Sequence, residues 1–284
     1  REPETLKSPG PDGVGRRQTR FMRDEIVRLQ MEARRIAARS RRPEFYRRFQ
    51  APLALARKLF FTHPLVARLR RKVEPLLHES LGHGFYHCKH VSLDCAALVC
   101  IEIEDDPAAQ EHVERLMVLA EMAGLLHDIS RSEKNHAEVG AREAERILEA
   151  FPVSAEEAHA ICQSIRNHEA FTDPVACSTE WGQMLSDCLY DADKFRWGPD
   201  NFTHTLWCMA SQKGISLEEL IERFPKGVSF VLRIQETFRT PLGRQYGPEI
   251  IETGIAIGKE LYRHLIQVHE VGEEQSAKRY DNGH

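Results

Sequence analysis

The segment Leu-Met-Val-Leu-Ala-Glu-Met-Ala-Gly-Leu-Leu-His-Asp, residues 116–128, decides the fold class. Its apolar run from Leu116 to Leu126 predicts a helix buried in the core. His127 and Asp128 follow directly, so they lie at the inner end of that helix. Ionisable groups are costly to bury unless something compensates them. A divalent metal ion bound by imidazoles and carboxylates is the simplest compensation.

Helical patterns continue on both sides of this segment. No convincing alternating strand, internal repeat or glycine-rich phosphate loop interrupts them. Asn135 and Ser154 mark helix starts, and Pro43 marks a helix end. The sequence therefore predicts an all-α fold. The expected helices span about residues 19–39, 44–58, 64–79, 87–100, 109–126, 136–150, 155–168, 179–193, 201–212, 216–224 and 249–270.

Four segments are expected along the chain. Residues 1–15 are rich in proline and glycine and predict disorder. Residues 16–79 form a basic helical extension, and residues 80–270 form a single metal-binding helical domain. Residues 271–284 form a polar tail that frays.

Charge is distributed unevenly along the 284 residues, although the net charge is only −4. Residues 1–72 carry 20 Lys and Arg against 7 Asp and Glu, and the remainder carries 19 against 36. Such asymmetry marks either a nucleic-acid surface or an arm that docks on the acidic body of its own chain. We favour docking, because no zinc-finger or RNA-binding motif is present. The basic helix carries an apolar stripe at spacings of three and four, formed by Met22, Ile26, Leu29, Ala33 and Ile36.

The seven cysteines indicate a reducing compartment. Their number is odd, and no two have the C-x-x-C spacing of a thiolate metal site or redox motif. Most lie among apolar neighbours, so we expect reduced core thiols in a cytoplasmic protein. No apolar run approaches the roughly 20 residues that span a bilayer, so no membrane partner is expected.

Six side chains that lie in five predicted helices or directly after them could converge on one metal centre, namely His87, His127, Asp128, His136, His168 and Asp193. Taken singly, His136, His168 and Asp193 are more typical of structural roles, such as a helix-terminal imidazole favoured by the dipole. Arg131 lies one helical turn after His127. A guanidinium beside a metal suits an anionic ligand such as phosphate, although a surface ion pair is the alternative interpretation. His83, His87 and His90 have the spacing of one helix face.

Together these motifs resemble the HD-domain metal-dependent phosphohydrolase superfamily over about residues 80–200. The stretch HGFYHCKHV at 83–91 is similar to the family's first-ligand helix, and LLHDISR at 125–131 is similar to its His-Asp motif. NHAEVGA at 135–141 resembles the second-metal motif, and DADKF at 191–195 the closing Asp motif, with the ligand placed at Asp193 rather than Asp191.

The resemblance implies a single HD-type helical domain with a basic N-terminal extension. It implies that His87, His127, Asp128 and Asp193 hold a first metal, and that Asp128 bridges to a second held by His136 and His168. The ligand set suits one or two ions of Mn²⁺, Fe²⁺, Co²⁺, Ni²⁺ or Mg²⁺.

The activity implied is hydrolysis of a nucleotide or another small phosphoester by a metal-activated water that attacks phosphorus. Asp128 would be both ligand and catalytic residue. Arg131 and Lys194 would neutralise phosphoryl oxygens, and His83 would protonate the leaving oxygen. Asn167 precedes His168 where two-metal signalling phosphodiesterases of the superfamily carry a His-His pair, which argues against cyclic-di-GMP as substrate.

Two alternatives use the same residues. HD-type di-iron oxygenases employ a similar ligand set with O₂. A non-catalytic metal-binding module would instead engage a partner through its basic arm. The expected partner of the enzyme is a small phosphorylated substrate, and binding of nucleic acid is not expected. The sequence does not decide between a monomer and a homo-oligomer.

Overall fold

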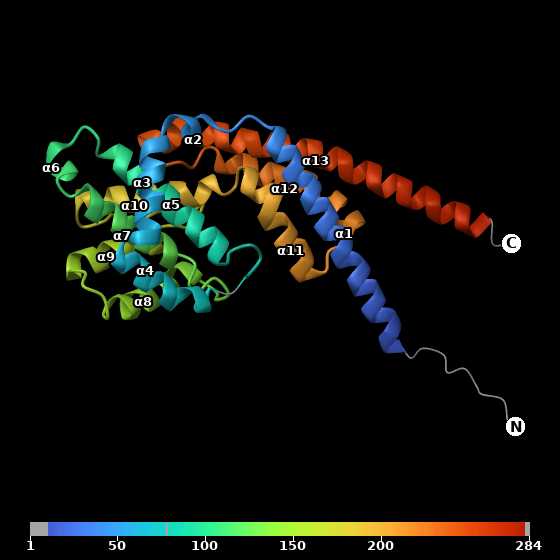
Figure 1. Ribbon diagram of the computed structural model, residues 1–284, viewed down its shortest axis with the longest axis horizontal. Coiled ribbons are helices and arrows are strands. Elements are labelled where there is room, and N and C mark those ends of the chain that lie inside the picture. The colour runs from blue at the N-terminus through green and yellow to red at the C-terminus, as the bar shows by residue number, and fades with distance from the viewer. Residues whose placement is uncertain (1–10, 78, 282–284) are drawn as a thin grey trace, which may run out of the picture.

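The computed structural model describes residues 11–77 and 79–281. All regular structure in these residues is helical, with no strand among them, so the predicted all-α fold is confirmed. In Figure 1 most helices gather around α5, α7 and α10, while the ends of α1 and α13 extend to one side. The elements are α1 (Pro11–Arg39), α2 (Glu44–Arg48), α3 (Gln50–Thr62), α4 (Pro64–Val73), the 3₁₀ turn η1 (Glu74–Leu76), α5 (Phe85–Glu102), α6 (Pro107–Gln110), α7 (Val113–Leu126), α8 (His136–Leu148), α9 (Ala155–Arg166), α10 (Glu180–Phe195), the π-helix η2 (Asn201–Thr205), α11 (Leu206–Lys213), α12 (Leu217–Ile234) and α13 (Pro241–Asp281).

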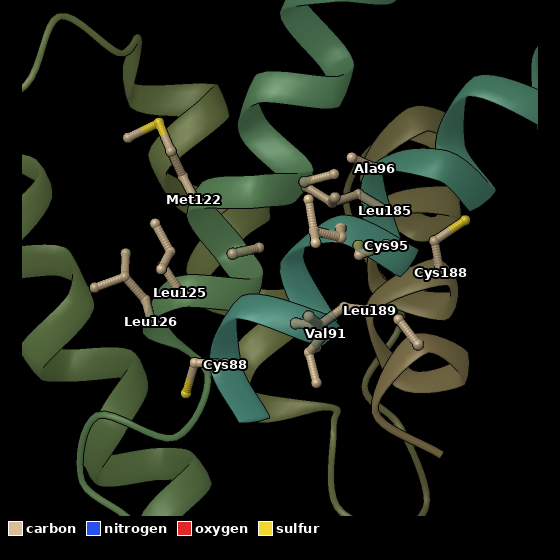
Figure 2. Packing of buried hydrophobic residues seen from close by; sticks show 14 of the residues in the cluster. Cys88, Val91, Cys95, Ala96, Met122, Leu125, Leu126, Leu185, Cys188 and Leu189 are labelled. Atoms are coloured by element: carbon tan, nitrogen blue, oxygen red, sulfur yellow. The ribbon is translucent and has the colours of Figure 1, made fainter. Parts of the chain in front are cut away.

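The main core forms where α5, α7 and α10 pack together. Figure 2 shows core side chains of these three helices, with Cys88, Val91, Cys95 and Ala96 from α5, Met122, Leu125 and Leu126 from α7, and Leu185, Cys188 and Leu189 from α10. The backbones of α5 and α7 approach closely at Gly124, where an added Cβ would lie 2.5 Å from the Ser92 Cα. Only glycine permits this approach. The contact sets the two helices that carry His87 and His127 side by side.

Helices α3 and α4 belong to the same core. Phe60, Val66 and Leu69 are fully buried within it. The predicted boundary between residues 79 and 80 therefore does not divide the core. Cationic residues such as Arg71 and Lys72 occupy the exposed faces of these short helices. Their number makes the apolar faces of the helices hard to recognise in the sequence.

Helix α1 docks by its apolar stripe on a second, smaller cluster. Leu29, Ala33 and Ile36 are buried there together with Trp207 of α11 and Leu261 of α13. The docking expected for the basic helix is therefore observed over residues 26–36, whereas the side chain of Met22 lies outside the described part. Arginines of α1 occupy the opposite, exposed face.

Both ends of the chain are more helical than the sequence predicted. Helix α1 begins at Pro11, so the structure describes residues 11–15 as helix where the sequence predicted disorder, and residues 1–10 lie outside the described part. Proline suits the first position of a helix, where its missing N–H has no partner to lose. Residues 271–281 continue α13 rather than fray, because extending an existing helix requires no new nucleation. Residues 282–284 lie outside the described part.

Helices α12 and α13 also continue past prolines at which the sequence predicted that they end or begin. Helix α12 continues through Pro225 to Ile234, and the burial of Val231 and Ile234 offsets a cost of about 3 kcal/mol for proline inside a helix. Helix α13 begins at Pro241 instead of residue 249. The hydroxyl of Thr240 accepts a hydrogen bond from the Gly243 N–H at 2.8 Å. It thereby caps the helix, because it gives a partner to one of the free backbone N–H groups of the first turn.

Among the residues that the structure describes, no helix combines the length and the apolar character that crossing a bilayer requires. All seven cysteines lie in the described part of the chain, and all are free thiols.

Candidate metal centre

The ends of five helices bring the six predicted ligand residues together. His87 lies in the first turn of α5, and His127 and Asp128 follow the last residue of α7. His136 is the first residue of α8, and His168 comes two residues after α9. Asp193 lies in the last turn of α10. All are buried except His136, which is partly exposed.

Three of these side chains form the first half of the cluster. The Nε2 atom of His87 lies 3.1 Å from the Nε2 atom of His127 and 3.1 Å from Oδ1 of Asp193. The Nε2 atom of His127 lies 3.9 Å from the same Asp193 oxygen. These atoms face one another as the ligands of a single cation would.

The second half consists of His136, His168 and one oxygen of Asp128. The two imidazoles face each other with 3.2 Å between their Nε2 atoms. Oδ1 of Asp128 lies 3.5 Å from Nε2 of His168 and 3.8 Å from Nε2 of His136. This triad could hold a second cation.

Asp128 connects the two halves. Its Oδ2 lies 3.5 Å from the Nε2 atom of His87 and 3.4 Å from that of His127, while its Oδ1 faces the other pair. Oδ1 is buried and has no hydrogen-bond partner. A buried carboxylate oxygen without a partner is costly. A cation between Asp128, His136 and His168 would satisfy it, so these residues suit a bridged pair of ions.

Backbone carbonyls fix the orientation of two of the imidazoles. Nδ1 of His127 donates to the Gly124 carbonyl at 2.8 Å, and Nδ1 of His168 donates to the Ile165 carbonyl at 2.6 Å. Both rings therefore turn Nε2 toward the cluster. In each half, two such nitrogens face each other at hydrogen-bond distance, which requires a proton or a metal ion between them. Metal-binding histidines are commonly held in this way by the other ring nitrogen.

The electrostatic environment favours the ligand forms of most of these groups. Burial lowers the pKa of His87 to about 4, and burial together with His168 and Arg131 lowers the pKa of His136 to about 4. Although burial raises the pKa of Asp128, the adjacent His127 imidazole holds it well below its usual range. Asp128 in turn raises the pKa of His127, so His127 must release a proton when a cation binds.

Lys194 takes a different place from the one predicted. Its side chain is buried, pairs with the Asp193 carboxylate and donates to the His168 carbonyl at 3.0 Å. The predicted contact with a substrate phosphoryl group does not fit this placement. The lysine instead lowers the pKa of Asp193, against the effect of burial, and orients two of the candidate ligands from behind.

His83 and Arg131 form the solvent-facing rim of the cluster with His136. His83 precedes α5, so it does not share a helix face with His87, but its Nδ1 lies 2.9 Å from Oδ2 of Asp128. Arg131, whose side chain is 32% exposed, places Nη1 2.8 Å from Nε2 of His136. Its Nη2 lies 3.4 Å from Nε2 of His83. The third histidine of the predicted face, His90, contacts the Tyr86 carbonyl instead.

Three further residues support the cluster. Glu169, which no sequence pattern singled out, places Oε1 3.0 Å from Nδ1 of His136. Asn167 is buried and donates to the Val175 carbonyl at 2.9 Å, so the residue before His168 holds the chain in place. Asp191 accepts the backbone N–H groups of residues 239 and 240, each at 2.8 Å, which leaves Asp193 to face the cluster.

Comparison of the chain with family models, with curated proteins and with solved structures gave no match. The function of the cluster is therefore inferred from its own residues.

Proposed function

We propose that the chain is an HD-type metal-dependent phosphohydrolase that cleaves a nucleotide or another small phosphoester. The observation that carries this proposal is Asp128, whose two oxygens face two separate pairs of imidazoles beside a cationic rim. The order of the ligand residues along the helices supports the resemblance to the superfamily. A histidine or an ion pair with a purely structural role would not require two pairs of imidazoles around one carboxylate.

The residues suit two divalent ions, one held by His87, His127 and Asp193 and the other by His136 and His168, with Asp128 shared between them. Nitrogen and oxygen donors of this kind suit Mn²⁺, Fe²⁺, Co²⁺, Ni²⁺ or Mg²⁺. When bound, such ions supply a nucleophilic hydroxide at neutral pH and Lewis acidity toward phosphoryl oxygens. Lys194 keeps Asp193 ionised, and the carbonyls behind His127 and His168 keep both rings aimed inward.

Arg131 supplies the preference for an anionic substrate. It is the most exposed of the polar groups around Asp128, and its guanidinium lies within 3.7 Å of Oδ1 of that residue. At this distance its positive charge partly offsets the charge on Oδ1, although the guanidinium makes no hydrogen bond to that oxygen. Once a cation takes over that role, the guanidinium can turn to a phosphoryl group and bind two of its oxygens.

His83 is placed to protonate the leaving oxygen. Asp128 fixes the orientation of its ring through Nδ1, which leaves Nε2 beside Arg131 at the rim. A proton donor must lie within hydrogen-bond reach of the bond that breaks. A phosphoester bound by Arg131 therefore presents its leaving group to His83.

The test is phosphate release without oxygen. Metal-free protein is loaded with each of the five ions under anaerobic conditions and offered nucleoside phosphates and a chromogenic phosphoester. We expect release that is lost in Asp193→Asn and retained in Asp187→Asn, a matched carboxylate change on the same helix outside the cluster. No release from any ester would overturn the proposal. Oxygen consumption by the iron-loaded protein would then indicate an oxygenase, and bound metal without either reaction a binding module.

A further inference from the structure

A second group of metal-ligand side chains lies outside the centre described above. Glu79, His204 and Cys208 come from the loop before α5, the π-helix η2 and helix α11. One ligand atom from each lies within 4.8 Å of the others. We propose that these three residues bind a zinc ion, independently of the phosphohydrolase centre.

The separation of the two inner ligands matches zinc geometry. Zinc binds thiolate sulfur at about 2.3 Å and imidazole nitrogen at about 2.0–2.1 Å, in tetrahedral arrangement. These lengths place sulfur and nitrogen about 3.6 Å apart across the ion. Sγ of Cys208 lies 3.7 Å from Nε2 of His204. The protein therefore presents both ligands at the spacing that the ion requires.

The local backbone holds the ligands in this arrangement. His204 and Cys208 are four residues apart, so both lie on one helix face, and the π-helical turn over Asn201–Thr205 sets the position of His204. π-helical turns are rare and frequently occur at functional sites. The two helices thus supply a fixed pair of ligands.

The loop that carries Glu79 is fastened to the same surface. Gln212 of α11 donates to the Glu79 carbonyl at 2.7 Å and accepts from the Leu81 N–H at 2.7 Å. Gly82 has a positive φ of 90°, and a Cβ there would lie 2.8 Å from the Cα of Thr205. The main chain beside Glu79 is therefore held against η2 and α11. Glu79 is an exposed residue, and one of its carboxylate oxygens already lies within 4.8 Å of the ligand atoms of His204 and Cys208.

The donor set selects the metal. A thiolate with an imidazole and a carboxylate suits zinc, whereas Mg²⁺ and Mn²⁺ prefer oxygen ligands. The site is partly open to solvent, so water can fill the fourth position. It differs from the buried centre in having a cysteine ligand, and this difference makes it separately measurable.

The zinc site would also stabilise the position of His83. The loop from Glu79 to Gly84 includes His83, whose ring contacts Asp128. A metal that joins Glu79 to α11 restricts this loop at its start. That consequence rests on the proposed function, but zinc binding itself does not.

Cobalt substitution tests the site in the full-length protein. Co²⁺ added to metal-free chain should give near-ultraviolet thiolate-to-cobalt absorption, and Zn²⁺ should abolish it. We expect the band in wild type, in Asp128→Ala and in Cys100→Ser, a matched change at another half-buried cysteine. Cys208→Ser and His204→Gln should both lose it while their circular dichroism stays native.

Cys88 provides the decisive control, because its thiol lies beside His127 in the other centre. Cys88→Ser should keep the band. The proposal is overturned if the wild type shows no band while binding Co²⁺. It is equally overturned if the band survives in Cys208→Ser and disappears in Cys88→Ser.

Discussion

Replacing Arg131 with alanine tests the role of the cationic rim. The guanidinium contacts Nε2 of His136 at 2.8 Å and lies 3.7 Å from Oδ1 of Asp128, but it is not one of the candidate ligands. Removing it should therefore leave the metals bound and remove stabilisation of the phosphoryl charge. Loss of one such contact costs about 2–4 kcal/mol, a decrease in rate of roughly 30- to 1000-fold.

The assay is anaerobic phosphate release by metal-loaded wild type, Arg131→Ala and Arg131→Lys. Lysine should restore only part of the rate, because an ammonium cannot make the paired contacts of a guanidinium. Arg142→Ala is the matched control, since Arg142 forms an exposed ion pair with Glu138 on α8. Unchanged turnover in Arg131→Ala, or loss of its metals, would refute the assigned role.

Three further changes probe other parts of the molecule. His136→Ala should remove mainly the second ion, and unchanged metal stoichiometry with full activity would reduce the centre to one ion. Leu29→Ala should destabilise the chain by about 2–4 kcal/mol, measured by denaturant unfolding, without altering turnover, because Leu29 is buried where α1 docks. Glu121 is fully buried without side-chain partners, and burial raises its pKa to about 9. The folded chain thus keeps a proton that the unfolded chain loses above about pH 4.5, so stability falls by about 1.4 kcal/mol per pH unit from there toward pH 9. Glu121→Gln should remove this slope, and an identical pH dependence in both proteins would count against a neutral Glu121.

The sequence predicted most of the helices because apolar residues recur along it at helical spacing, and it placed the candidate ligand residues in or beside these helices. Ionisable residues within apolar helical segments are conspicuous, so His127 and Asp128 after the α7 run pointed directly to a buried centre. The choice of Asp193 over Asp191 followed from the family resemblance. In the structure Asp191 instead accepts hydrogen bonds from two backbone N–H groups just before α13.

The sequence could not show which way a side chain points or which groups it contacts. Lys194 sits beside Asp193 in the chain, but only the packing of α10 shows that its ammonium turns inward. The pairing of Glu79 with Cys208 depends on a π-helical turn and on contacts between segments over a hundred residues apart. The sequence predicted that α3 and α4 belong to a basic extension, because the many Lys and Arg residues on their exposed faces dominate the composition of this segment. Their buried apolar faces became clear only from the packing.

The start of α13 had a local signal that was missed. Thr240 and Pro241 are typical of a helix cap and first turn. The expected helix nevertheless began only at about residue 249, because Gly243, Gly247 and Pro248 follow closely and are typical of turns. Packing of Tyr246 and Ile250 into the core sustains the helix across this segment.

Metal content tests the central claim most directly. Wild type and Asp128→Ala are purified without chelator, loaded with Mn²⁺ to avoid the thiolate site, freed of excess ion and measured by elemental analysis. The shared carboxylate predicts bound manganese in wild type and its loss from a folded Asp128→Ala, because both halves of the centre depend on Asp128. Equal manganese in the two proteins, or none in wild type under any loading condition, would contradict a metal centre bridged by Asp128.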